Sequence, residues 1–272
     1  MRRHILRIGI VLLFCGADVV AQQRSSRRTP LGTQVPRPSL PPRGQESKTQ
    51  RVPPEPARVA LERAANAHGG QDFRNITDSI AEGTLTRYDM QNPHEQFAVT
   101  MWRKGNLVQR SVRSPNGERR QGTDGKQTWD AFGGFVTAAE GPTLEFLETQ
   151  TVRALPNLFE YEVRGSRLRD DGMRGPDRVL AVEEANGRTT TYVIEGGRSL
   201  VTRFEVVSGQ APDMLGRRMS IIESYLFSDF RTVQGVPTPF KIEHFTNDLK
   251  VDELRFTTIR YNTGLAADMF HP

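Results

Sequence analysis

The 272-residue chain carries 37 Lys and Arg against 32 Asp and Glu, and its one cysteine is Cys15. Ten of these basic and three of these acidic residues lie in 1–56, so 27 basic and 29 acidic residues remain for 57–272. The larger part of the chain is therefore nearly neutral. It lacks the basic face that binds phosphates, which excludes DNA or RNA as the expected partner.

The first 21 residues have the composition of a secretory signal peptide. Three arginines precede the apolar run 8–15, and Val19 and Ala21 fit the −3 and −1 cleavage positions. The run is shorter than the ~20 apolar residues that span a bilayer. We therefore expect cleavage and a periplasmic or secreted bacterial protein without thiols or disulfides. The alternatives are a retained signal anchor and lipidation at Cys15, although Phe14 before it is not the small residue that lipidation requires.

Residues 22–56 are predicted to be a disordered linker. They hold eight of the seventeen prolines and almost no large apolar side chain, so they cannot build a core. We expect a plain solvated spacer, and the alternative is peripheral contact of its basic charge with an anionic envelope membrane. Residues 57–272 have the length of one domain, and no second low-complexity segment divides them.

The domain is expected to open with a helix that ends at Gly69-Gly70 and has an apolar stripe of Val59, Leu61, Ala64, Ala65 and Ala67. Alternating polar and apolar residues then predict strands over 79–86, 96–103, 107–113 and 126–132. A second helix is predicted over 142–154, interrupted at Pro156-Asn157, with one face formed by Leu144, Leu147, Thr151 and Leu155.

Strands are predicted to resume after the second helix, and Asp170-Asp171-Gly172 is interpreted as a hairpin turn. The predicted strands are 178–184, 189–195, 200–207, 218–233, 239–246 and 251–261. Ten or eleven strands, two helices and no parallel crossover repeat predict an α+β fold. We expect a strongly curved antiparallel sheet, an incomplete β-barrel, with helices against one face.

The sequence shows no catalytic or metal-binding motif. The five histidines lack ligand spacing, and HExxH, GxSxG and P-loop patterns are absent. His68, beside the glycines that end the first helix, and His94, after Asn92-Pro93, are interpreted as surface or capping groups. His244 is interpreted as an ordinary strand position. We therefore expect no enzyme activity, no metal and no cofactor.

Four short segments of 57–272, taken in their order along the chain, are similar to those of a known family. They are Ala67-His68-Gly69-Gly70 with Glu82-Gly83-Thr84, then Asp124-Gly125 with the strand residue Trp129, then the strand, turn and strand of 228–242, and finally 261–272. Together they resemble the LolA-like superfamily of periplasmic outer-membrane lipoprotein carriers, lipoprotein-sorting proteins and their relatives. No segment is a catalytic signature.

This resemblance implies an incomplete barrel whose helices cover an apolar, acyl-binding cavity. A curved sheet too wide to be filled by its own side chains leads to the same expectation. The family's carrier holds its lid closed with an arginine, and the sequence does not decide among Arg87, Arg103 and Arg110. The residues expected to line the cavity or its lid are Trp102, Trp129, Leu144, Leu147, Leu155, Phe204, Val206, Phe240, Ile242, Leu254 and Phe256.

The expected function is non-catalytic binding of a lipid, a lipoprotein acyl chain or another apolar ligand. For Trp102 and Trp129 a plain core position is favoured over a contact with the ligand. For the whole domain the alternative is a structural or protein-interaction module with a filled core. A continuous apolar cavity of at least ~300 Å³ between sheet and helices would favour ligand binding over this alternative.

Overall fold

The computed structural model describes residues 57–89, 91–213 and 215–272. The predicted signal peptide and linker lie outside this range. Within it, thirteen antiparallel strands form one sheet. The strands are β1 (Asp78–Asp89), β2 (Asn92–Lys104), β3 (Leu107–Ser114), β4 (Gly117–Thr123), β5 (Thr128–Phe132), β6 (Phe135–Ala138), β7 (Arg167–Arg174), β8 (Asp177–Glu183), β9 (Thr189–Ile194), β10 (Val201–Pro212), β11 (Arg218–Val233), β12 (Val236–Thr246) and β13 (Leu249–Tyr261).

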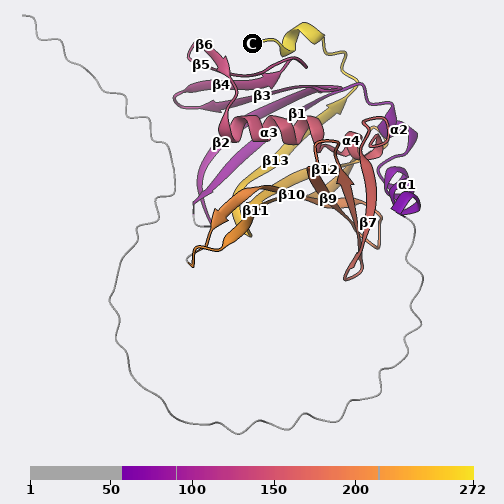
Figure 1. Ribbon diagram of the computed structural model, residues 1–272. Helices are drawn as coiled ribbons and strands as arrows, with labels where there is room; N and C mark the ends of the chain where they lie inside the picture. Colours follow the sequence, from indigo (N-terminus) through magenta and orange to yellow (C-terminus); the bar gives the residue numbers. More distant parts are fainter. Residues whose placement is uncertain (1–56, 90, 214) are drawn as a thin grey trace, which may run out of the picture. The chain divides into compact units, whose positions relative to one another are not determined.

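The sheet consists of two meanders joined at its centre. Its order is β6-β5-β4-β3-β2-β1-β13-β12-β11-β10-β9-β8-β7, so every neighbouring pair is a sequential hairpin except β1 with β13. That pair aligns Ser79 with Tyr261. The sheet curves strongly and stays unclosed, with β6 and β7 as its two edges (Figure 1). This confirms the predicted curved antiparallel sheet.

Ten of the thirteen strands match predicted ones, and β4, β6 and β7 were not predicted. The interpretation of Asp170-Asp171-Gly172 as a hairpin turn is wrong, because all three residues lie inside β7. The register with β8 shifts between Asp170 and Gly172, where Gly172 has a φ of 87°. The glycine therefore marks a β-bulge, at which one strand gains a residue and pairing then continues.

The described residues form four α-helices and one 3₁₀ helix. They are α1 (Ala57–Ala67), α2 (Gln71–Arg74), α3 (Gly141–Val152), α4 (Leu155–Phe159) and η1 (Ala267–Phe270). The predicted second helix thus stops at Val152, and Pro156 lies in the first turn of α4, where its missing N–H costs nothing. α1 contacts β7, and α3 contacts β3, β4 and β5. None of these helices is long and apolar enough to cross a membrane.

The apolar side chains form three clusters instead of one continuous core. The first joins α1 and α4 to β8–β11, the second lies on β1, β2, β12 and β13, and the third groups Val108 and Ala139 with Leu147 of α3. Ile242 packs against both the first and the second cluster. Interiors are normally packed without large voids, so separate clusters leave room for a cavity between them.

The C-terminal segment covers the face of the β4–β5 hairpin that is opposite to α3. Trp129 is 2% exposed, and its indole Nε1 donates to the Phe270 carbonyl at 3.0 Å. A Cβ on the cross-strand neighbour Gly122 would lie 2.6 Å from Trp129 Cζ2, so only glycine leaves room for the ring.

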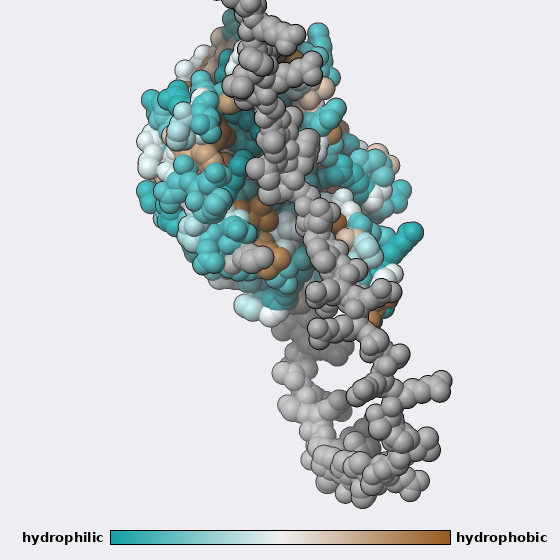
Figure 2. Space-filling view, turned by 90° about the vertical axis from the view of Figure 1, so that its left-hand side faces the viewer, coloured by the Kyte–Doolittle hydropathy of each residue, from teal (hydrophilic) through white to brown (hydrophobic). Residues whose placement is uncertain are grey.

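Polar residues dominate the face shown in Figure 2, with hydrophobic residues grouped near its middle.

Candidate functional site: a cavity between sheet and helices

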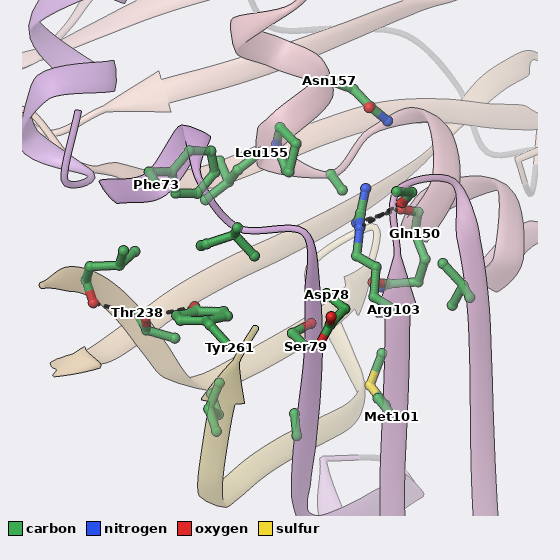
Figure 3. Close-up of a pocket in the computed structure, with 18 of the residues that line it drawn as sticks. Phe73, Asp78, Ser79, Met101, Arg103, Gln150, Leu155, Asn157, Thr238 and Tyr261 are labelled. Atoms are coloured by element: carbon green, nitrogen blue, oxygen red, sulfur yellow. Dashed lines mark hydrogen bonds between the residues drawn. The ribbon is translucent and has the colours of Figure 1, made fainter. Parts of the chain in front are cut away.

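A cavity of about 410 Å³ lies between the sheet and the segments α2, α3 and α4. Figure 3 shows side chains from both sides converging on it. Apolar side chains from all three clusters border it, among them Val108, Phe159 and Phe256. The cavity therefore occupies the space that the clusters leave between them.

The floor of the cavity consists of two rows of residues across the strands. Because side chains alternate along a strand, residues two apart share a face. One row aligns Arg103 of β2, Ser79 of β1 and Tyr261 of β13, and the second aligns Met101, Ala81 and Ile259 in the same order. All six line the cavity. The central β1–β13 pairing thus sits directly beneath the cavity.

The opposite wall is aromatic and is built around His68. The rings of Phe73 in α2 and Phe159 in α4 meet edge to face at 5.4 Å, and both line the cavity. His68 is 0% exposed, with its ring 6.2 Å from Phe73 and 5.9 Å from Phe159. Its Nε2 accepts the backbone N–H of Val201 at 2.9 Å.

The interpretation of His68 as a surface or capping group is therefore wrong. α1 ends at glycines of positive φ, which turn the chain into α2 and leave the His68 ring between α2, α4 and the sheet. Burial lowers the pKa of His68 to about 4, so the imidazole is neutral at pH 7. His94, by contrast, is exposed.

Arg103 links the cavity floor to α3. Its Nε donates to the Gly105 carbonyl at 3.1 Å, and its Nη1 donates to the Gln150 carbonyl of α3 at 3.0 Å. Burial lowers the pKa of Arg103 to about 10, so the guanidinium remains charged at pH 7. Of the other two arginines considered from the sequence, Arg110 stacks 3.5 Å from the Phe146 ring of α3, and Arg87 pairs with Glu95.

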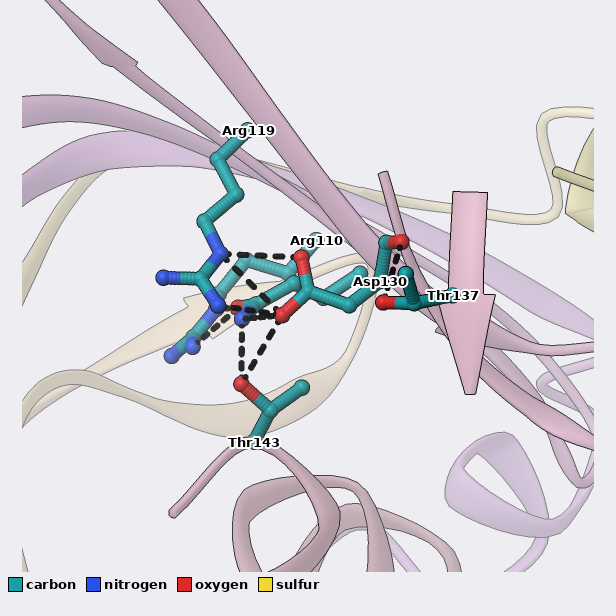
Figure 4. Close-up of polar contacts among 6 residues, drawn as sticks. Arg110, Arg119, Asp130, Thr137 and Thr143 are labelled. Carbon is teal, nitrogen blue, oxygen red and sulfur yellow. Dashed lines mark hydrogen bonds and ion pairs between the residues drawn. The ribbon is translucent and has the colours of Figure 1, made fainter. Parts of the chain in front are cut away.

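Polar contacts hold the first turn of α3 (Figure 4). Thr143 donates through Oγ1 to Asp130 Oδ2 at 3.2 Å and accepts from Gln121 Nε2 at 2.7 Å. Burial alone would raise the pKa of Asp130, but hydrogen bonds from Arg119 and Gln121 hold it below its usual range. α3 is thus attached to the sheet by Thr143 near its start and by Arg103 near its end.

The sequence-predicted site residues fall into two groups. Trp102, Leu155, Ile242 and Phe256 line the cavity. The other seven are buried or partly buried elsewhere: Leu144 and Leu147 in the third cluster, Phe204 in the first, Phe240 and Leu254 in the second, Val206 on β10, and Trp129 under η1.

Sequence reasoning missed Phe73, Met101, Arg103 and Tyr261 as cavity-lining residues. Met101 and Arg103 stand two apart on a predicted strand, so the period-2 pattern would have placed them on one face. Phe73 lies in the four-residue α2, which carries no periodic signal of its own.

A second cluster of titratable groups lies on β11–β13. His244 approaches Glu223 at 2.8 Å through Nε2 and Asp252 at 3.3 Å through Nδ1, and it stacks on Tyr225 at 4.4 Å. Burial alone would lower the pKa of His244, but the two carboxylates outweigh it and raise this pKa to about 9. Both ring nitrogens are occupied, so His244 offers no free lone pair to a substrate. Among the described residues, no group of His, Cys, Asp and Glu is arranged for a metal ion.

No family model and no curated protein matches the chain in sequence. Solved structures are similar to it. A domain assigned to outer membrane lipoprotein-sorting proteins from Vibrio parahaemolyticus is 15% identical with a TM-score of 0.53, covering 79% of this chain and 97% of that one. A DUF1329 family protein from Desulfovibrio piger is 12% identical with a TM-score of 0.54, over 80% and 98%. A LolA superfamily protein from Nitrosomonas europaea is 12% identical with a TM-score of 0.52, over 79% and 97%. The chain therefore has the LolA-like fold that its sequence resemblance implies.

Proposed function

We propose that the domain binds the acyl part of a lipid or lipoprotein, or a similar apolar ligand, in the cavity between sheet and helices. The cavity carries this proposal: at about 410 Å³ it exceeds the ~300 Å³ of small ligand sites, and apolar side chains supply much of its wall. A filled core, which the structural or interaction module would require, has no such space.

The fold likeness supports the same class of ligand. The name of the Vibrio parahaemolyticus protein refers to lipoprotein sorting, and that chain is matched over 97% of its length. The helices would act as the cover of the cavity, with α3 held by Thr143 and Arg103. The site of action would be the cell envelope, reached through the predicted signal peptide.

The domain would act without catalysis. The strongest titratable cluster, around His244, has both imidazole nitrogens engaged by carboxylates, and the cavity is lined by neither Glu223 nor Asp252. A general base needs a free lone pair within hydrogen-bond reach of the substrate. These contacts favour binding over chemistry.

Lipid extraction and native mass spectrometry of protein purified from the exported fraction test this function. We expect acylated ligands on the parent protein and their loss in Ala81→Phe, which fills the floor of the cavity. The matched control is Thr258→Phe, because Thr258 is on the neighbouring strand, exposed and outside the cavity lining. A parent protein that neither retains nor takes up any acylated ligand contradicts the proposal.

A further inference from the structure

We propose that the cavity takes a single-chain amphiphile whose anionic head group pairs with Arg103. This inference rests on the proposed function and names its ligand class: one acyl chain that ends in a carboxylate or a phosphate. Two observations support it: the Arg103 guanidinium has no carboxylate partner among the described residues, and the cavity has room for one alkyl chain.

The Arg103 guanidinium has unused hydrogen-bonding capacity. It carries five N–H donors in a fixed fork. Two contacts are made, from Nε to the Gly105 carbonyl and from Nη1 to the Gln150 carbonyl. Both acceptors are neutral, and among the described residues no carboxylate lies within 4.0 Å of Arg103. The charge therefore has no counter-ion within 57–89, 91–213 and 215–272.

The other charged groups near Arg103 do not supply one. Glu160 lines the cavity but is exposed and forms no ion pair with Arg103, and Arg164 acts on Arg103 with the opposite sign. Asp78 also lines the cavity, but its carboxylate accepts the Thr263 N–H at 2.7 Å, the Thr263 hydroxyl at 2.8 Å and the Gly264 N–H at 3.1 Å. Arg74, a second cation, is also part of the lining. An incoming anion therefore finds Arg103 without an ion-pair partner among the described residues and Asp78 already hydrogen-bonded.

Burial makes the missing counter-ion costly. Removal from water disfavours the charged form, and it lowers the pKa of Arg103 to about 10. Arg103 is half-buried, and a partly desolvated cation is stabilised when it is paired with an anion and hydrogen-bonded. A carboxylate or phosphate accepts from a guanidinium through two oxygens at once, and such charge-assisted bonds are stronger than those to carbonyls. An anionic head group bound to Arg103 would therefore offset the desolvation of the guanidinium.

The walls next to Arg103 suit an alkyl chain. Met101 and Ala81 follow it along the floor, and Ile259 and Phe256 continue the apolar surface on β13. The cavity of about 410 Å³ is large enough for a single alkyl chain of medium length. With Arg103 as its partner, the head group would lie at the β2–β3 turn.

A pair of ligands that differ only in charge tests the inference. Tetradecanoate and 1-tetradecanol have the same chain, and their binding to the full, delipidated protein can be compared by calorimetry at pH 8, where the carboxylate and Arg103 are both ionised. We expect tetradecanoate to bind at least tenfold more tightly. Tetradecyl phosphate should share the preference, whereas acetate and inorganic phosphate, which lack the chain, should not bind measurably.

Variants of Arg103 locate the preference. Arg103→Gln should bind the acid and the alcohol equally, and Arg103→Lys should keep part of the preference because it keeps the charge. Arg255→Gln is the matched control: Arg255 pairs with Glu253 and does not line the cavity, so the tenfold ratio should persist.

Three results would overturn the inference. Equal affinity of the parent protein for acid and alcohol would show that the head group finds no cation, and this comparison needs no variant to fold. A preference that survives in Arg103→Gln would place the anion elsewhere and leave Arg103 as a helix anchor only. Binding of neither ligand would refute the proposed function as well, which separates that failure from the first two.

Discussion

The buried histidine beside the cavity predicts how the stability of the domain depends on pH. The pKa of His68 falls from 6.5 in the unfolded chain to about 4 in the folded one. Between these values the unfolded state binds a proton that the folded state cannot accept. The free energy of unfolding therefore decreases as the pH falls through this window.

The size of this effect follows from the pKa difference. Each unit is worth about 1.4 kcal/mol, so the full shift of His68 corresponds to about 3 kcal/mol. About 1.5 kcal/mol of this is lost between pH 6.5 and about pH 5, above the range where most carboxylates titrate. Urea unfolding of the parent and of His68→Gln over that range measures it, because glutamine is neutral and can still accept the Val201 N–H.

The comparison depends on slopes and not on absolute stability. Burial raises the pKa of Glu145, which titrates nearby with the opposite sign, but it is present in both proteins and cancels. We expect the parent to lose stability more steeply than His68→Gln by about 1.5 kcal/mol. Parallel curves, or an NMR titration that places the His68 imidazole near 6.5, would refute the buried, neutral histidine.

Three further outcomes follow from the packing and charges. Gly122→Ala should lower the free energy of unfolding by about 1–3 kcal/mol in urea, because its Cβ would lie 2.6 Å from Trp129 and 2.8 Å from the Val108 carbonyl. Unchanged stability would contradict this close packing. Leu147→Ala should lower the free energy of unfolding by about 2–5 kcal/mol, since Leu147 is 0% exposed at the α3–sheet contact. Hydrogen exchange in α3 should then be faster, and an exchange rate like that of the parent would contradict the contact. For His244 the folded pKa of about 9 exceeds the unfolded value of 6.5. Its contribution to stability is therefore complete below pH 6.5 and is lost as the pH rises through 9. The melting temperature should fall over that range in the parent but not in His244→Asn, and an equal fall in both proteins would contradict the ion pairs.

The predictable part of the fold is the part with strong local patterns. β10 alternates apolar with polar residues over Phe204, Glu205 and Val206, and β8 is a short continuous apolar run from Val179 to Val182. Turn residues bound both strands, so local pattern identifies them. β4 reads Gly-Glu-Arg-Arg-Gln-Gly-Thr, and its inward residues are polar. Gln121 is buried only because Thr143 and Asp130 meet it there, which no local pattern shows. Strands of this kind are visible only once the sheet is assembled.

The candidate site divides in the same way. Alternation on strands offered six residues for the cavity that the family resemblance implied, and of these Ile242 and Phe256 line it. The burial of His68 depends on Phe159 and Val201, which lie far along the chain, so the glycines beside it suggested exposure instead. For Arg103, the sequence offered a candidate but no partner, because its contact with Gln150 exists only after α3 has docked.

The β1–β13 pairing has a consequence for the order of folding. The first and last strands of the sheet are neighbours at its centre, and they bring Ser79 together with Tyr261. Contacts between residues so distant in sequence close a long loop and slow folding. The two meanders can form from local hairpins, but the cavity floor is complete only when the C-terminal strand arrives. In a chain exported before it folds, as the N-terminal segment predicts, the cavity would thus form last.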